Sequence, residues 1–507
     1  MTPGLLADGF SRQVFLINGQ TPGPLIEVDE GDELEVFVKN NLAVEMAIHW
    51  HGILQRGTPE MDGTIGVTQD PIQPGGNFTY RMHLEGEYGF YWYHAHSRAY
   101  SDDGIRGPLT IRPSPQRPKP YKHLADDEQD FATMQNAERE AVPLLLSDWY
   151  HRVSDDVYND YISTGMYPNN VDSLLANGQG QVQCLPQPES GMSMGSSSMN
   201  MSAASPTTSM AEGMTMNSGS PMTTDTMATE MASMDNMRRR AMEGSSMADM
   251  CMSMASTTTA AASAAAMSPM ASSTCTNMTA PLLAINANYT RGWLALNMVN
   301  GGSITKLSVS LDSHSMHVYA ADGFYVKPQE VQRYSVMVKL DQMPGNYTLR
   351  FASYPYGSDM QQVIEGQATI VYQGDTGMAM PMNMTSHVSA PWMLSNGSAT
   401  SNATLLSEQD LVLAEPASPP CHADITYNFF INQTDATTWA LNGTPYQTTQ
   451  VPLLYSNTSD GWNASTTLHV PLNSTVDIIL QIANDSMDAV SLAQTRPLAY
   501  LSCMNSS

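Results

Sequence analysis

Short runs of alternating apolar and polar residues recur along most of the chain. Residues 34–39 alternate Leu, Val and Val with Glu, Phe and Lys, and residues 307–312 and 476–482 repeat this alternation. Successive side chains of a β-strand point to opposite faces of its sheet, so each run predicts a strand with one buried face. Turn formers such as Pro22-Gly23-Pro24 separate the runs. The pattern predicts an all-β fold of Greek-key sandwiches.

The chain has 507 residues, which is too long for one hydrophobic core and indicates several domains. The proline-rich residues 113–120 predict a stiff exit from the first domain, and the apolar run at 142–149 suits a buried strand. The predicted divisions are a first domain over 1–115, a linker over 116–140 with a short helix, a second domain over 141–373, a linker over 374–420 and part of a third domain over 421–488.

A segment of different composition, residues 191–279, interrupts the second domain. Met, Ser, Thr, Ala and Gly dominate it and large apolar side chains are scarce, so we expect disorder. It contains Met-x-Met spacings such as the one at Met192 and Met194, and thioether sulfur favours Cu(I). Two interpretations stay open: a copper-gathering tether and, favoured on composition, an O-glycosylated spacer.

The charge balance excludes some classes of partner. Lys and Arg number 22 against 49 Asp and Glu, which gives a net charge of −27. This argues against nucleic-acid binding, which needs a basic face, and against anionic membrane surfaces. No run of 18 or more apolar residues occurs, so no transmembrane helix is expected. The sequence predicts no oligomeric state.

The composition and the glycan acceptor sites favour a secreted or cell-wall protein. Asn-x-Ser/Thr sites stand at Asn77, Asn346 and Asn473, among others, and we expect glycans at several. The first residues lack the charged and apolar regions of a signal peptide and are not expected to be one. Five cysteines leave one over; Cys184 and Cys421, which flank the second domain, are one candidate pair, and the pairing stays open.

Two His-x-His runs stand in strand-like segments, His49-Trp50-His51 and His94-Ala95-His96. Two imidazoles in such a run share one face of a strand, about 7 Å apart at a rise of about 3.4 Å per residue. Two such strands side by side would present four imidazoles to one space. Imidazole suits copper, which stands highest in the Irving–Williams order. One His-x-His alone is usually incidental, but the two together predict a site for more than one metal ion.

Three other histidines are expected to be structural. His151 follows an apolar run and has no paired histidine beside it. His314 and His317 are three residues apart, so on a strand they face opposite ways and do not chelate one ion together.

Residues 14–112 resemble the first cupredoxin domain of the multicopper oxidases, the family of laccases and ferroxidases. They look most like ascomycete laccase-like oxidases, including those linked to conidial pigment. The stretches that carry the resemblance are LINGQTPGPLIEVDEGDELEVFVKN, HWHGILQRGTPEMDGTIGVTQDPIQPGGNFTYRM and YGFYWYHAHSRAYSDDGIRGPLTI. It extends more loosely through Gln373 and again from Ile425 to Ile482. The resemblance implies tandem cupredoxin-like β-sandwiches, the third of them truncated.

In that family the two motifs supply half the ligands of a trinuclear copper cluster. The resemblance assigns His49 to the type 2 copper and His51, His94 and His96 to the type 3 pair. Asp62, in MDGTIGVTQ, resembles the carboxylate beside the cluster, which orients water and helps move protons. A local turn cap is the alternative for this residue.

The resemblance stops near the carboxyl end. Residues 476–482 are not followed by the family's His-Pro-x-His-x-His motif, no His-Cys-His run occurs, and residues 489–507 are unlike the family. The chain as written therefore lacks type 1 copper ligands and half of the cluster ligands. We expect no type 1 copper, doubtful catalysis, and aggregation through the uncovered faces of an incomplete third sandwich. Asp103 matches the turn after the second motif and is expected to be structural.

The leading hypothesis is a laccase-like oxidase that takes single electrons from small phenols, pigment precursors among them, and reduces O2 to water. A ferroxidase of iron uptake, a non-catalytic copper-binding protein and a copper-free scaffold are the alternatives.

Overall fold

The computed structural model describes residues 2–164, 170–187, 275–329, 334–354, 362–374, 391–406, 411–415, 420, 422–435, 438–446, 451–456, 468 and 470–482. All of them belong to one compact unit, residues 1–190 with 275–507. The insert predicted over 191–279 lies outside the described residues as far as Thr274, and the tail predicted over 489–507 lies outside them entirely.

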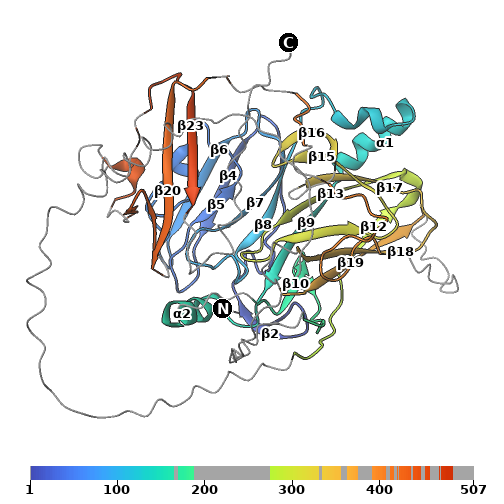
Figure 1. Cartoon of the computed structure of the whole chain (residues 1–507), viewed down its shortest axis with the longest axis horizontal. Coiled ribbons are helices and arrows are strands. Elements are labelled where there is room, and N and C mark those ends of the chain that lie inside the picture. Colours follow the sequence, from blue (N-terminus) through green and yellow to red (C-terminus); the bar gives the residue numbers. More distant parts are fainter. Residues whose placement is uncertain are drawn as a thin grey trace, which may run out of the picture. The chain divides into compact units, whose positions relative to one another are not determined.

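The first eight strands form three small sheets, here called the amino-terminal sheets (Figure 1). β1 (Thr2–Leu6) pairs with β2 (Ser11–Val14), and β4 (Glu33–Lys39) pairs with β6 (Asn77–His83). The third sheet has the order β3-β8-β7-β5, made of β3 (Ile26–Asp29), β8 (Arg106–Arg112), β7 (Gly89–Ala95) and β5 (Ile48–His51). Only the β3/β8 pair in it is parallel.

The amino-terminal core follows the predicted alternation. In β4, Leu34 is 8% exposed and its two valines pack against the core, whereas Phe37 is 62% exposed. Trp50 of β5 and Tyr80 of β6 are almost fully buried in one cluster, with ring centroids 5.3 Å apart. Two sheets thus pack face to face, as in a β-sandwich.

Two larger sheets, here called the central sheets, carry the next strands. A seven-stranded sheet has the order β11-β10-β9-β13-β17-β15-β16 and a four-stranded sheet the order β12-β19-β18-β14. The strands are β9 (Val142–Trp149), β10 (Ser173–Ala176), β11 (Gln179–Gly180), β12 (Ala284–Asn288), β13 (Trp293–Asn300), β14 (Leu307–Leu311), β15 (Met316–Ala321), β16 (Phe324–Gln329), β17 (Tyr334–Lys339), β18 (Asn346–Ser353) and β19 (Glu365–Gln373). Leu144, Leu296 and Phe351 lie in the core between the two sheets.

Helices are few and short. α1 (Glu128–Arg139) falls in the predicted linker, and Asp127 caps it by accepting a hydrogen bond from the amide of Asp130 at 2.7 Å. The others are α2 (Ser154–Thr164) and the 3-10 turns η1 (Pro59–Met61), η2 (Pro120–Leu124), η3 (Tyr289–Arg291) and η5 (Leu453–Tyr455). Within the described ranges no helix has the length and apolar character needed to span a bilayer.

The last sheet, here called the carboxyl-terminal sheet, has the order β22-β21-β20-β23. Its strands are β20 (Ile425–Asp435), β21 (Thr438–Leu441), β22 (Thr444–Pro445) and β23 (Val476–Ile482). The inward alternation predicted for β23 is wrong in part, since Ile478 is 53% exposed and Leu480 is 37% exposed. The strand exists, but no second sheet covers this face within the described part of the chain.

The cysteine pair considered from sequence is also corrected. Cys184 forms a disulfide with Cys275, not with Cys421. Val182 and Met278 form an antiparallel bridge, which brings the two half-cystines to a Cα separation of 5.7 Å. The disulfide therefore joins the two ends of the methionine-rich insert. Cys251, Cys421 and Cys503 lie outside the described residues.

Candidate metal centre

The two His-x-His runs lie on neighbouring antiparallel strands. In the register of β5 and β7, His49 pairs with His94 and His51 pairs with Trp92. Paired residues share a face of the sheet, as do residues two apart along a strand. The histidines therefore lie on one face, while Trp50 and Tyr93 of the opposite face are buried in the core. This is the convergence that the sequence predicted.

The imidazoles lie close enough to share metal ions. The ring centroid of His49 lies 5.5 Å from that of His51, 5.4 Å from that of His94 and 5.4 Å from that of His96. Nδ1 of His51 is 3.4 Å from Nε2 of His94. One ligating atom each of His49, His51 and His94 can be chosen so that all three lie within 4.8 Å of one another. His96 stands just beyond this group, with its centroid 6.3 Å from that of His94.

Backbone carbonyls fix the orientation of two of these rings. Nδ1 of His49 donates to the carbonyl oxygen of Asp62 at 2.7 Å, and Nδ1 of His94 donates to that of Ala95 at 3.0 Å. Because Nδ1 carries the proton in each ring, Nε2 is the nitrogen that can bind a metal. A ligating histidine generally has such a partner on its other nitrogen.

Their surroundings keep His94 and His96 neutral, as metal binding requires. Burial and the neighbouring imidazoles together lower the pKa of His94 to about 4, against the opposing hydrogen bond to Ala95. Burial and the charge of His49 likewise lower the pKa of His96. At neutral pH these rings present lone pairs rather than positive charges. A set of neutral imidazole nitrogens fits copper.

Asp62 lies beside His49, where a tight loop returns to β5. Its Oδ2 accepts a hydrogen bond from the Thr64 hydroxyl at 2.6 Å, and its Oδ1 is 3.5 Å from Nδ1 of His49. Gly63 has a φ of +85°, and a Cβ there would lie 1.9 Å from the carbonyl oxygen of Ile48. Only glycine lets the loop approach β5 so closely. Asp62 therefore makes both the local turn contact and the contact to the histidine set.

The three remaining candidate histidines lie away from this face and have partners of their own. His151 stacks on Phe10 with ring centroids 3.9 Å apart, and its Nε2 is 2.9 Å from Oδ2 of Asp8. His314 is hydrogen-bonded through both ring nitrogens, to the carbonyl of Asp312 and to the hydroxyl of Tyr372. His317 packs edge-on to Trp293. These contacts support the structural roles predicted for them.

Asp103 is structural, as predicted. It forms an ion pair with Arg12 in which both side chains are at most 2% exposed, and it accepts hydrogen bonds from the amide and hydroxyl of Ser154 at 3.0 and 2.7 Å. Sequence reasoning missed the neighbouring Asp102 and Arg106, which are also buried, and it gave no role to Trp92. The position of Trp92, two residues before His94, was the available signal, since it places both side chains on one face.

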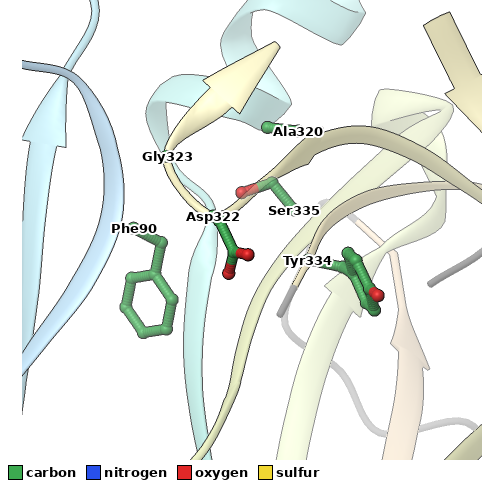
Figure 2. A pocket seen from close by; sticks show the side chains of 6 residues that line it. All are labelled: Phe90, Ala320, Asp322, Gly323, Tyr334 and Ser335. Carbon is green, nitrogen blue, oxygen red and sulfur yellow. The ribbon is translucent and has the colours of Figure 1, made fainter. Parts of the chain in front are cut away.

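A small cavity lies between Phe90 of β7 and the central sheets (Figure 2). Its other lining residues are Ala320, Asp322, Gly323, Tyr334 and Ser335. It offers about 10 Å³ to the centre of a water molecule, which is room for about one water. None of the four histidines lines it, so it is not part of the candidate metal centre.

Comparison with known proteins places the chain in a family. Models described as multicopper oxidase match residues 3–116 and residues 140–226 with 279–375. The chain is 32% identical over 466 residues to a laccase of Pestalotiopsis fici, covering 90% of this chain and 68% of that protein. It is 30% identical over 458 residues to the laccase abr2 of Aspergillus fumigatus, covering 87% and 68% respectively.

Solved structures confirm the cupredoxin-like β-sandwich fold. Fet3p, described as a multicopper oxidase that functions in iron import, has a TM-score of 0.56 at 18% identity, covering 94% of this chain and 70% of that one. The laccase of Botrytis aclada has a TM-score of 0.52 at 20% identity, covering 87% and 62%. The family models and the sequence relatives show that the chain belongs to the multicopper oxidases, copper-dependent oxidoreductases that use O2.

Proposed function

We propose that the protein is a laccase-like oxidase that removes single electrons from small phenols, pigment precursors among them, and reduces O2 to water. The observation that carries the proposal is the set of imidazoles on one face of β5 and β7, three of which bring ligating atoms within 4.8 Å of one another. The laccases of similar sequence support the substrate class.

Within this proposal His49 holds the type 2 copper, and His51, His94 and His96 hold the type 3 pair. Bound copper supplies the electron transfer to O2. The protein's own groups orient the ring of His49 and supply a proton to water beside the site. The carbonyl of Asp62 fixes the ring of His49 through a 2.7 Å hydrogen bond. Oδ1 of the same residue, 3.5 Å from that ring, is placed to hold a proton and pass it to water beside the site.

The 507 residues contain no His-Cys-His run. We therefore propose that these residues by themselves take up copper without forming a type 1 site. Copper bound by the chain should show no strong blue absorption band, and oxygen uptake with a phenol should be weak or absent. A strong blue band after copper loading would contradict this part of the proposal.

We further propose that the protein is secreted or held in the cell wall and carries N-glycans. Asn77, Asn346, Asn402 and Asn473 all stand in acceptor sites and are exposed, which supports modification there. A fall in apparent mass after treatment of the natively secreted protein with an N-glycosidase tests this point.

The test of the site itself is copper content. The metal-free chain is loaded with copper and desalted, and bound metal is measured beside oxygen uptake with a simple phenol. Replacing all four histidines by alanine should abolish copper retention. His83→Ala is the matched control, because His83 is exposed at the end of β6 in the same part of the chain and makes no contact with the set in the structure. Retention of copper by the fourfold variant would remove the proposal.

A further inference from the structure

Trp92 lies between the candidate copper ligands and the central sheets. Its indole stacks on the ring of His94 with centroids 4.2 Å apart and planes 25° apart, and it lies 5.2 Å from the ring of His51. The indole is 9% exposed and belongs to a buried cluster with Leu145 of β9 and Val299 of β13. One side chain thus contacts two proposed ligands and the second half of the molecule.

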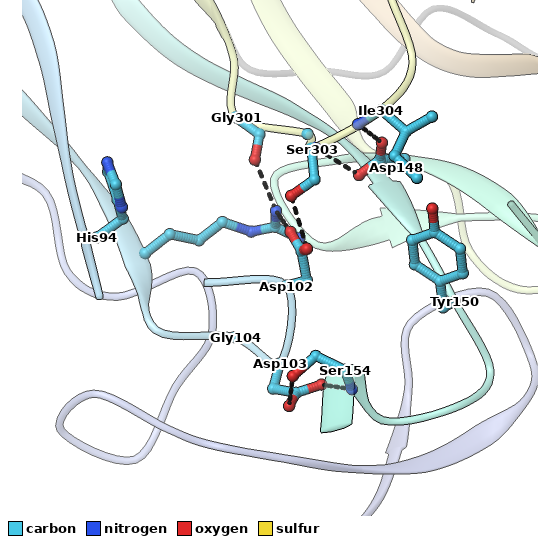
Figure 3. A network of polar contacts seen from close by, with 12 residues as sticks. His94, Asp102, Asp103, Gly104, Asp148, Tyr150, Ser154, Gly301, Ser303 and Ile304 are labelled. Atoms are coloured by element: carbon cyan, nitrogen blue, oxygen red, sulfur yellow. Dashed lines mark hydrogen bonds and ion pairs between the residues drawn. The ribbon is translucent and has the colours of Figure 1, made fainter. Parts of the chain in front are cut away.

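Arg106 makes a second connection from the same place. It pairs with His94 in the register of β7 and β8, so both side chains leave the same face of the sheet. Its Nη1 donates to the carbonyl oxygen of Gly301 at 2.8 Å and lies 3.7 Å from Oδ1 of Asp102. A dashed line in Figure 3 marks the hydrogen bond to the carbonyl of Gly301.

Gly301 belongs to the loop 300–305, which starts at Asn300, the last residue of β13, and this loop is tightly held. The carboxylate of Asp148 accepts hydrogen bonds from the amides of Ser303, Ile304 and Thr305 at 3.0, 2.8 and 3.0 Å. The hydroxyl of Ser303 donates to Oδ2 of Asp102 at 2.6 Å (Figure 3). Three amides on one buried carboxylate leave the loop little freedom.

The contact between this loop and Trp92 is so close that even a methyl group on Gly301 would press on the indole. A Cβ on Gly301 would lie 3.3 Å from Cζ3 of Trp92 and 3.7 Å from Cδ2 of Leu145. The φ of Gly301 is not in the left-handed region, so the close approach of the indole, and not backbone strain, accounts for glycine at this position. Any side chain there must move the indole that lies on His94.

We infer that Trp92 is a positioning residue for His51 and His94, and that the loop 300–305 holds it in place through Gly301. The inference rests on the proposed function, since it concerns those imidazoles as copper ligands. The χ2 torsion of histidine is soft, so a hydrogen bond at one nitrogen leaves ring rotation incompletely fixed. A buried indole against the ring face removes much of that freedom. Ligands held in the binding orientation bind metal more tightly.

The test measures the copper site and not turnover. Cu(II) is added to the full metal-free chain, its retention against a competing chelator is measured, and the electron paramagnetic resonance spectrum is recorded. Trp92→Ala and Gly301→Ala should each weaken retention about tenfold, the size of effect expected when the support of a ligand is lost, and should shift the copper hyperfine splitting. Trp92→Phe should recover part of both, because a smaller ring still covers His94.

Trp149→Ala is the matched control. Trp149 is 2% exposed and packs between the amino-terminal strands and the central sheets under the guanidinium of Arg12, 4.1 Å from the ring centroid. Its loss should lower the melting temperature as Trp92→Ala does and leave the copper signals unchanged. Should Trp92→Ala and Gly301→Ala behave like this control, Trp92 only fills space and the inference is overturned. If Trp92→Ala does not fold, Gly301→Ala decides.

These outcomes separate the inference from the proposed function. An unsubstituted chain that retains no copper overturns both. An unsubstituted chain that retains copper, with unchanged retention and spectra in Trp92→Ala and Gly301→Ala, overturns the inference alone.

Discussion

His94 of β7 is half-buried and His314, which precedes β15, is buried, yet the two rings are held in opposite ways. Both ring nitrogens of His314 have a hydrogen-bonding partner of another kind, the Asp312 carbonyl and the Tyr372 hydroxyl. His94 has a carbonyl on one nitrogen, while its other nitrogen faces the ring of His51 at 3.4 Å. A ring nitrogen that faces a second imidazole is placed to share a metal ion with it. Burial alone therefore does not distinguish a structural histidine from a ligand, but the partner of the second nitrogen does.

The largest expected effect comes from removing proposed copper ligands on β5 and β7. Replacing His49 and His94 together by alanine should weaken copper retention by at least about 100-fold, since loss of a ligand's support alone costs about 10 to 100-fold. Their carbonyl partners, Asp62 and Ala95, remain in place. Chelator competition gives the number, and unchanged retention would show that the metal binds elsewhere.

The next largest effect concerns His314, the structural histidine of the central sheets. His314→Ala removes two hydrogen bonds and leaves the Tyr372 hydroxyl buried against a void, so the free energy of unfolding should fall by about 2–3 kcal/mol. Copper retention should stay at the level of the unsubstituted chain. Denaturant unfolding and metal analysis on the same preparation check both halves, and a loss of copper without a loss of stability would reverse the assignment.

The pH dependence of stability adds a second comparison, between His314 and Asp102, a buried group whose pKa shifts in the opposite direction. Burial and the charge of Asp148 together raise the pKa of Asp102 to about 6, against the opposing charge of Arg106. Between pH 6 and about 3.8 the folded chain binds this proton before the unfolded chain does, so this group makes stability rise as pH falls. Asp102→Asn should remove that rise, about 3 kcal/mol.

His314 should contribute the opposite slope, because burial lowers its pKa and the unfolded chain is protonated first as pH falls below about 6.5. Unfolding of the metal-free chain across this range, with Asp102→Asn and His314→Ala measured in parallel, separates the two contributions. Identical profiles for the unsubstituted chain and Asp102→Asn would show that folding does not raise the pKa of Asp102.

The smallest effect concerns the carboxylate of Asp62. Asp62→Ala should weaken copper retention about tenfold, because it removes the carboxylate oxygen that lies 3.5 Å from Nδ1 of His49 and leaves the backbone carbonyl in place. Thr64→Ala is its control, since it removes the 2.6 Å turn hydrogen bond and leaves the carboxylate in place. Equal effects of the two substitutions would indicate that Asp62 acts as a turn cap and nothing more.

The sequence predicted the strands and the shared face of His49, His51, His94 and His96 correctly because both follow from local geometry. It did not predict that Ile478 and Leu480 would be exposed, because exposure depends on what packs over a strand and not on the strand's own alternation. The Cys184–Cys275 bridge was missed for a related reason. It depends on the antiparallel approach of Val182 and Met278, whose positions 96 residues apart carry no local signal.

Residue order by itself determined which side chains leave the same face of a strand, since the period of two is built into the extended backbone. That was enough to bring four imidazoles together and to indicate copper. Only the tertiary structure decided what surrounds them: the loop that returns Asp62 to His49 past Gly63, and the contact of Trp92 with Gly301, which lies in a loop some 200 residues away. Such contacts form when distant segments close onto one another, and loop closure and sheet packing are properties of the whole chain.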